Sequence, residues 1–187
     1  MPGTDGISAQ QARIREALER VLSRNIAGLK TLEDITMDFG STPKDIIHSR
    51  GTTKLYHYTP ICDEIYRVPI VLVMSLVSRY YIMDLAPGQS LVEYLVDQGF
   101  DVYLIDWGIP RPEHRHLNLD HYVGEVLPEC LEKVREDSGE EEVSLVGYCL
   151  GGVLAMMHTA LARPGQVRAL ACFTTPVDTN GMTLYKA

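Results

Sequence analysis

The chain has 187 residues, of which 45% are hydrophobic and 22% are charged. This length and balance are typical of one globular domain with a sizeable core. Seventeen basic residues against 25 acidic ones give a formal net charge of -8, which argues against a nucleic acid or an anionic membrane as a partner.

The first 53 residues are predicted to form a helical arm followed by a connector. Ser8 and Gln11 match a capping box, and the apolar residues after them fall on one helical face: Ile14, Ala17, Leu18, Val21 and Leu22. Turn-forming residues in "TMDFGSTPKDIIHSRGTT", 36–53, indicate the connector. The strand propensity of "KLYHYTP", 54–60, predicts an early edge strand.

From residue 68 onward, apolar strands alternate with helices. The continuous apolar run "VPIVLVMSLV" is expected of a parallel strand that is buried on both faces. In the helix predicted at 90–99, Ser90 and Glu93 form a capping-box pair and Gly99 suits a C-terminal cap. The other expected elements are strands at 101–106, 142–147 and 167–173, a helix at 119–137 with a kink or new segment at Pro128, and a helix at 151–162. This alternation predicts an α/β fold with helices on both faces of a mostly parallel sheet.

Four cysteines are spread along the chain without a CxxC pair or a zinc-binding spacing: Cys62, Cys130, Cys149 and Cys172. This usage favours a reduced, cytoplasmic setting. The N-terminal "MPGTDGISAQQ" lacks the basic and apolar regions of a signal peptide, and "PIVLVMSLV" is too short to span a membrane as a helix. The histidine-rich "RPEHRHLNLDHY" is predicted to be a solvated loop that runs into a helix. We therefore expect a soluble protein without a metal site.

The stretch "VSLVGYCLGGVLAMMH" carries the candidate chemistry. A strand ends at Gly147 and a helix starts near Gly151, so Cys149 lies at the centre of a sharp strand-to-helix turn. A Cβ at Gly147 or Gly151 would collide with the adjoining backbone, and Gly152 lets the helix pack closely. The turn presents the sulfur at the carboxyl end of the sheet, where the helix N-terminus favours the thiolate. The Leu150 N–H is then placed to hold a developing oxyanion.

Two interpretations of Cys149 compete. An isolated cysteine is most often a small buried hydrophobe, which is the interpretation for the other three cysteines. A complete elbow after a buried strand favours a nucleophile at Cys149. Such a nucleophile needs an acid and a histidine, which follow it in that order in the α/β-hydrolase fold. Only Asp178 and His158 follow Cys149, and His158 lies on the elbow helix, where it cannot face the sulfur.

The predicted fold class is therefore an α/β-hydrolase fold that is incomplete at the C-terminus. We expect residues 54–187 to form the first part of a catalytic domain, truncated before its cap and before the strands that carry the acid and the histidine.

Four segments resemble the polyhydroxyalkanoate synthases in order and spacing. They are "VLVMSLVSRYYIMDLAPGQSLVEYLVDQGFDVYLIDWGIP", "LNLDHYV", "VSLVGYCLGG" and "FTTPVD". The similarity covers about residues 54–180, with a weaker likeness in the N-terminal arm. The box "GYCLGG" alone also resembles that of dienelactone hydrolases, which lack the first segment.

The resemblance implies a thioester chemistry. In the family, the cysteine at the position of Cys149 takes an (R)-3-hydroxyacyl group from coenzyme A, and repeated transfer extends a polyester. Coenzyme A is then part of the substrate, and no further cofactor is implied. A second oxyanion donor is implied near Val77, although Ser78 and Met74-Ser75 depart from the family's usual residues there. Asp178 is interpreted as structural, and the family's acid and histidine have no counterparts within residues 1–187.

The short arm resembles the synthases that work with an accessory subunit, and a homodimer is a further expectation. The family also implies a cytoplasmic location at the surface of polyester granules. Two alternatives stay open: a cysteine hydrolase of the dienelactone hydrolase or thioesterase type, and a truncated homologue without catalysis. Because the acid and the base are missing, we expect little turnover from these 187 residues alone.

Overall fold

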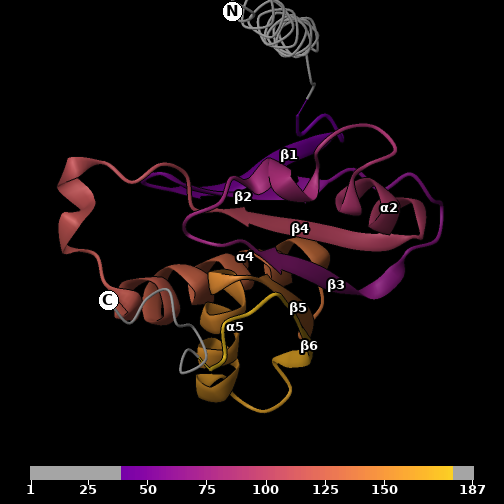
Figure 1. Ribbon diagram of the computed structural model, residues 1–187. Coiled ribbons are helices and arrows are strands. Elements are labelled where there is room, and N and C mark those ends of the chain that lie inside the picture. The colour runs from indigo at the N-terminus through magenta and orange to yellow at the C-terminus, as the bar shows by residue number, and fades with distance from the viewer. Residues whose placement is uncertain (1–38, 179–187) are drawn as a thin grey trace, which may run out of the picture. The chain divides into compact units, whose positions relative to one another are not determined.

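The structure of the chain, a computed structural model, describes residues 39–178 (Figure 1). The predicted helix that begins after Ser8 lies outside this range. The described part contains a six-stranded sheet in the order β1-β2-β4-β3-β5-β6. The strands are β1 (Lys44–Arg50), β2 (Thr53–Tyr58), β3 (Tyr66–Val73), β4 (Phe100–Asp106), β5 (Val143–Tyr148) and β6 (Val167–Phe173).

Strands β3 to β6 are parallel, as the alternating strand and helix pattern predicted. The apolar run of β3 is buried on both faces, since Val71, Leu72 and Val73 are at most 1% exposed. The β1–β2 hairpin extends this sheet, because β2 pairs antiparallel with both β1 and β4. The incomplete α/β-hydrolase fold expected from the sequence is the fold observed.

The hairpin corrects two predictions. The segment 36–53, predicted to be a connector, contains β1, and β2 lies between two strands and not at an edge. Arg50 pairs with Thr53, so the turn has two residues, and Gly51 takes up a φ of 62° there. A two-residue loop that begins with glycine is typical of a tight hairpin. This signal was present in the sequence, but the charged and half-exposed residues of β1 hid the strand.

The helices begin and end close to their predicted bounds. Ser90 Oγ accepts a hydrogen bond of 2.9 Å from the Glu93 N–H, and Gly99 follows the helix end with a φ of 80°. Pro128 lies in the first turn of a new helix, as expected. The helical elements are η1 (Tyr80–Met83), α2 (Leu91–Asp97), η2 (Pro112–His116), α3 (Leu119–His121), the π-helix η3 (Tyr122–Val126), α4 (Leu127–Ser138) and α5 (Leu150–Leu161).

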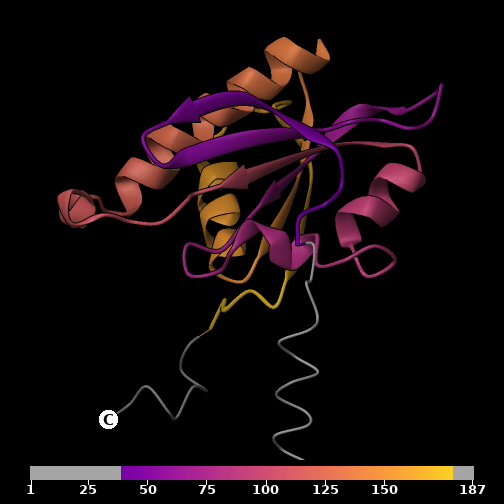
Figure 2. The ribbon, with the colours of Figure 1, turned by 90° about the horizontal axis from the view of Figure 1, so that it is seen from above.

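The helices cover both faces of the sheet. Helix α2 lies against one face, and helices α4 and α5 lie against the other (Figures 1 and 2). The core between the sheet and α4 and α5 includes Leu127, Leu131 and Leu154, none of which is exposed. No helix among residues 39–178 is long and apolar enough to cross a membrane.

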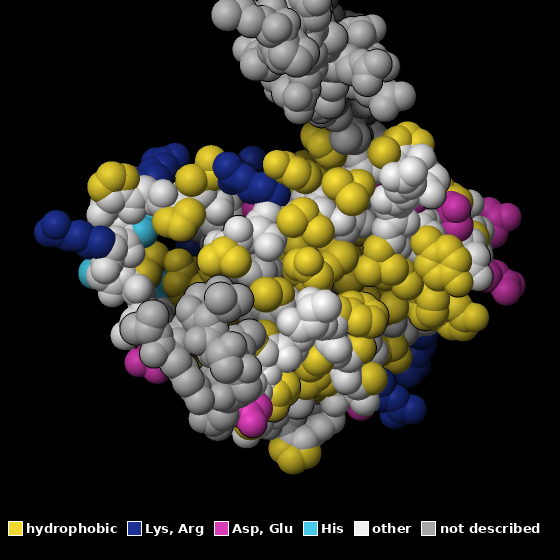
Figure 3. All heavy atoms as spheres, in the orientation of Figure 1, with side chains coloured by type: hydrophobic (Ala, Val, Ile, Leu, Met, Phe, Trp, Pro, Cys, Tyr) yellow, Lys and Arg dark blue, Asp and Glu magenta, His cyan; other side chains and the backbone are white. Residues whose placement is uncertain are grey.

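Within residues 39–178, no element covers a large part of the sheet beside α2. A hollow of about 420 Å³ crosses four strands there, and its lining includes Ile70, Phe100, Val146, Leu170 and Ala171. Space-filling spheres show hydrophobic side chains over much of the side seen in Figure 1 (Figure 3). An apolar surface of this kind favours association.

We expect the 187-residue chain to self-associate through this open face, and Val146→Lys to raise the monomer fraction by placing a charge in the hollow. Sedimentation velocity over a concentration series measures both. Ala160→Lys, at an exposed position of α5, is the matched control and should associate like the parent chain. A parent chain that stays monomeric at every concentration would contradict this expectation.

A charged cluster ties β2, β4 and α4 together. His57 Nε2 lies 2.8 Å from Asp101 Oδ1, and its Nδ1 lies 2.9 Å from Asp137 Oδ2. The ring stacks on Tyr103, whose hydroxyl donates to Asp137. Burial lowers the pKa of His57, but the hydrogen bonds and charges of the two carboxylates outweigh burial and leave the pKa raised. The imidazolium therefore stabilises the folded state.

Because the pKa of His57 is raised on folding, its stabilisation is complete below the unfolded value of about 6.5 and is lost as the pH rises through the folded value. Urea unfolding of the parent chain and of His57→Gln should therefore give free energies that converge with rising pH. The exposed His116→Gln variant should keep the parent's pH dependence. Parallel curves for the parent and His57→Gln would show that the cluster is not linked to stability.

Candidate active site

The turn between β5 and α5 places Cys149 at the centre of a strained elbow. Its backbone has a φ of 52° and a ψ of -122°, a conformation that residues other than glycine rarely adopt. Its N–H donates to Phe173 O on β6 at 2.9 Å, and its carbonyl accepts from the Gly152 N–H at 3.0 Å. The residue is half-buried at the carboxyl end of the parallel strands. The structure thus puts Cys149 at the sharp turn that the sequence predicted.

The three elbow glycines lie where a side chain has no room. A Cβ on Gly147 would come within 2.3 Å of Gly152 Cα, and a Cβ on Gly151 within 2.1 Å of Val73 O. A Cβ on Gly152 would come within 1.9 Å of Thr175 Oγ1. Strand β5, helix α5 and the end of β3 therefore meet through their backbones.

Trp107 fixes the end of β3 beside the elbow. Its indole Nε1 donates to Met74 O at 2.7 Å, and the same carbonyl oxygen would lie 2.4 Å from a Cβ on Gly151. The Trp107 ring packs edge-on against Tyr122, with 5.5 Å between the ring centroids. Trp107 is not among the residues predicted for the site, although a tryptophan directly after a buried strand was an available signal in the sequence.

The two predicted oxyanion donors differ in their surroundings. Leu150 is the first residue of α5, where a backbone N–H has no acceptor within its own helix. The Val77 N–H donates to Ser75 Oγ at 3.3 Å, and Val77 is 83% exposed. The Leu150 N–H therefore has no helical acceptor to release, whereas the Val77 N–H would have to release Ser75 before it could act as a donor.

The described histidines are held away from the thiol. His158 is 7% exposed, and burial lowers the pKa of its ring; its Nε2 is buried without a hydrogen-bond partner among the described residues. His48 pairs with Glu129, and His121 pairs with Glu125. Within residues 39–178, no hydrogen bond joins a histidine to Cys149, and no cluster of potential metal ligands is found.

The other cysteines differ from Cys149 in their surroundings. Cys130 is buried, and burial raises the pKa of its thiol to about 12, which agrees with the predicted structural role. The prediction of a buried hydrophobe is wrong for Cys62 and Cys172, which are exposed. Cys172 lies on β6, which is an edge strand of the described sheet and pairs with a neighbouring strand along one edge alone.

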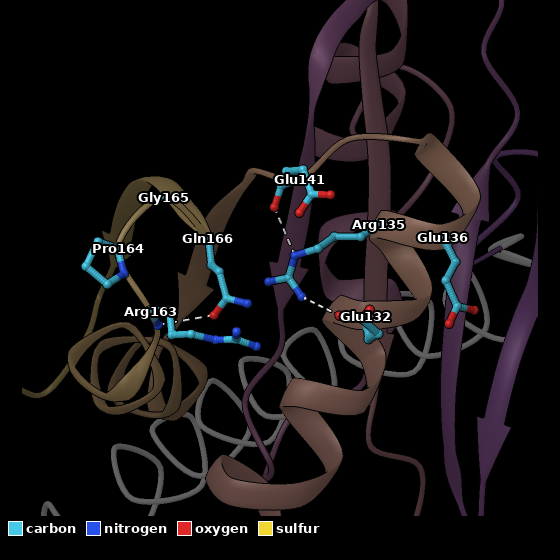
Figure 4. A pocket seen from close by; sticks show the side chains of 8 residues that line it. All are labelled: Glu132, Arg135, Glu136, Glu141, Arg163, Pro164, Gly165 and Gln166. Carbon is cyan, nitrogen blue, oxygen red and sulfur yellow. Dashed lines mark hydrogen bonds and ion pairs between the residues drawn. The ribbon is translucent and has the colours of Figure 1, made fainter.

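A polar hollow of about 460 Å³ lies apart from the elbow (Figure 4). Residues of α4 and the loop after α5 line it, and its Arg135 is held by Glu132 Oε2 and Glu141 O, each at 3.0 Å. The loop from Arg163 to Gln166 follows the C-terminal end of α5, a helix about 18 Å long that starts beside Cys149. The charged groups of this hollow therefore lie far from the thiol.

The sheet, the elbow and its glycines define the class of the protein, an α/β-hydrolase fold with a cysteine in the elbow. A family model described as alpha/beta hydrolase fold matches residues 77–186, and one described as poly-beta-hydroxybutyrate polymerase (PhaC) N-terminus matches residues 14–95. The chain belongs to the polyhydroxyalkanoate synthase family, as its sequence resemblance predicted.

Three curated relatives are named poly(3-hydroxyalkanoate) polymerase subunit PhaC. The protein of Haloferax mediterranei is 37% identical over 97% of this chain, that of Allochromatium vinosum 37% over 85%, and that of Synechocystis 33% over 90%. The chain spans 37%, 44% and 46% of the lengths of these relatives, respectively.

Solved structures agree on the fold. The Francisella virulence factor BioJ aligns with a TM-score of 0.58 at 14% identity, covering 83% of this chain and 51% of its own. A sugar hydrolase (YeeB) from Lactococcus lactis aligns with a TM-score of 0.53 at 16% identity, covering 75% of this chain and 58% of its own.

The close contact at Gly147 predicts a strong effect of a single methyl group. We expect Gly147→Ala to lower the free energy of unfolding by about 3 kcal/mol or more, because strand β5 or helix α5 must shift. Chemical denaturation measures the change. Gly124→Ala is the matched control, because a Cβ there meets nothing within 4 Å and should be tolerated. Equal stabilities of the two variants would refute the steric argument.

Proposed function

We propose that this chain carries the nucleophile-bearing part of a polyester synthase that polymerises (R)-3-hydroxyacyl groups from their coenzyme A thioesters. The observation that carries the proposal is Cys149 in a strained elbow at the carboxyl end of the sheet. The polymerase names of the relatives support the same substrate class.

In the proposed reaction the Cys149 thiolate attacks the thioester carbonyl of the substrate. The tetrahedral intermediate carries an oxyanion, which the Leu150 N–H stabilises, with the Val77 N–H as the second proposed donor. Collapse of the intermediate breaks the bond to sulfur of coenzyme A and leaves an acyl-Cys149 thioester. Because one thioester replaces another, the transfer is close to balanced in energy. The hydroxyl of a second unit then attacks this thioester and gives its proton to a base. The bond to Cys149 Sγ breaks, the thiolate is regenerated, and the ester chain is longer by one unit.

The base for these steps is proposed to come from outside residues 39–178. Within that range, both ring nitrogens of His57 are paired with carboxylates, and the ring of His158 is buried on the elbow helix. A single slow acylation of Cys149 needs only the thiolate, whereas repeated transfer needs a base to deprotonate the incoming hydroxyl. We therefore expect acylation without polymer from the 187-residue chain.

The setting of the enzyme is part of the same proposal. It comprises a cytoplasmic location at the surface of polyester granules, and an accessory subunit or a second copy as partner. Co-purification of the whole protein as an active enzyme without a partner would count against an accessory subunit.

A cysteine hydrolase of the dienelactone hydrolase or thioesterase type is the second candidate, because the sequence box around Cys149 fits both. Its product is a free 3-hydroxy acid and not a polyester. Product analysis of the whole protein by chromatography therefore separates the two functions.

We expect (R)-3-hydroxybutyryl-coenzyme A to add one 3-hydroxybutyryl group to the chain, because Cys149 is the proposed acceptor. Intact-mass spectrometry followed by peptide mapping measures the adduct. Cys149→Ala should abolish it, whereas Cys172→Ala, which removes an exposed cysteine, should keep it. Labelling that survives in Cys149→Ala, or polymer formed by these 187 residues alone, would overturn the proposal.

A further inference from the structure

A second strained residue lies directly across from Cys149. Among the described residues other than glycine, Cys149 and Thr174 have a positive φ, 52° and 50° respectively. A β-branched residue such as threonine is a genuine outlier in this region, because its side chain crowds the backbone. Such strain persists only where surrounding contacts hold it in place.

One carbonyl connects the two strained residues. Phe173 O accepts the Cys149 N–H at 2.9 Å, the Thr174 hydroxyl at 2.8 Å and the Thr175 hydroxyl at 3.4 Å. The register of β5 and β6 ends at Tyr148 opposite Phe173, so the bond from Cys149 extends the ladder one residue into the elbow. The direction of this carbonyl therefore sets the plane of the peptide that precedes Cys149.

The same turn also packs against the elbow helix. Thr175 is half-buried, and its Oγ1 would lie 1.9 Å from a Cβ on Gly152, so the threonine side chain fills the space that the glycine leaves. Gly152 belongs to the first turn of α5, whose first residue is Leu150. The turn thus contacts the elbow on both sides of the thiol, through the N–H before it and through the helix after it.

We propose that Phe173-Thr174-Thr175 is a positioning element of the active site, in which the Thr174 hydroxyl holds the carbonyl that fixes Cys149. This inference rests on the proposed acyl transfer for its chemistry, but the contacts themselves are independent of the substrate. Without the Thr174 hydroxyl, the turn relaxes from its strained conformation and Phe173 O rotates. The Cys149 sulfur and the Leu150 N–H then lose the relative placement that attack on a carbonyl needs.

The test compares Thr174→Val, which keeps the branched shape but lacks the hydroxyl, with Thr174→Ser, which keeps the hydroxyl. Thr159→Val is the matched control, because the Thr159 hydroxyl donates to Ala155 O at 2.7 Å within α5. The readouts are hydrogen exchange of the Cys149 amide and the rate of acylation of Cys149. The acyl donors are p-nitrophenyl acetate and (R)-3-hydroxybutyryl-coenzyme A, and circular dichroism checks that each variant is folded.

We expect Thr174→Val to exchange the Cys149 amide faster and to be acylated about tenfold more slowly than the parent. Thr174→Ser should restore both values, and Thr159→Val should change neither. Unchanged amide exchange in Thr174→Val overturns the inference, as does unchanged acylation by a donor that acylates the parent.

The two donors separate this inference from the proposed function. A parent chain acylated by p-nitrophenyl acetate but not by the coenzyme A thioester contradicts the proposed substrate, while the Thr174 variants still decide the positioning role. If neither donor acylates the parent, the proposed function fails in this chain, and amide exchange alone decides whether Thr174 holds the elbow.

Discussion

The whole site depends on backbone packing without intervening side chains, where the first turn of α5 meets the ends of β3 and β5. Gly147, Gly151 and Gly152 make this approach possible. A Cβ on any of them would lie at most 2.3 Å from an atom of a neighbouring backbone or side chain. The close approach puts Cys149 into its strained conformation and lets the helix N-terminus point at it.

Two neighbouring strands brace the junction from opposite sides. On one side Trp107 of the loop after β4 holds Met74 O at the end of β3, against Gly151. On the other side β6 supplies Phe173 O as the acceptor for the Cys149 N–H. Cys149 therefore cannot shift without breaking its hydrogen bond to Phe173 O, and the first turn of α5 cannot shift toward β3 without meeting Met74 O. This explains how a strained residue is kept at a strand end that is only half-buried.

Prediction from the sequence was correct where a local pattern has one physical cause. Apolar runs predicted the parallel strands, the Ser90–Glu93 pair predicted the start of α2, and glycine spacing predicted the elbow. It missed β1, whose exposed polar residues carry no burial signal, and the bracing role of Trp107. The strain at Thr174 was unreadable, because the carbonyl that its hydroxyl contacts, Phe173 O, also bonds to Cys149, about 25 residues earlier in the chain.

The π-helix η3 makes the packing around the elbow sensitive to chain length. A π-turn holds one residue more than an α-turn. The residues at its start are therefore rotated about the helix axis, relative to α4, by about 100°, the angle of one residue in an α-helix. In this orientation the Tyr122 ring packs against the Trp107 ring, and Trp107 in turn donates a hydrogen bond to Met74 O at the end of β3. A homologue one residue shorter in η3 would turn Tyr122 away from Trp107. Insertions and deletions in this short segment are therefore coupled to the elbow, although it lies more than 20 residues earlier in the sequence.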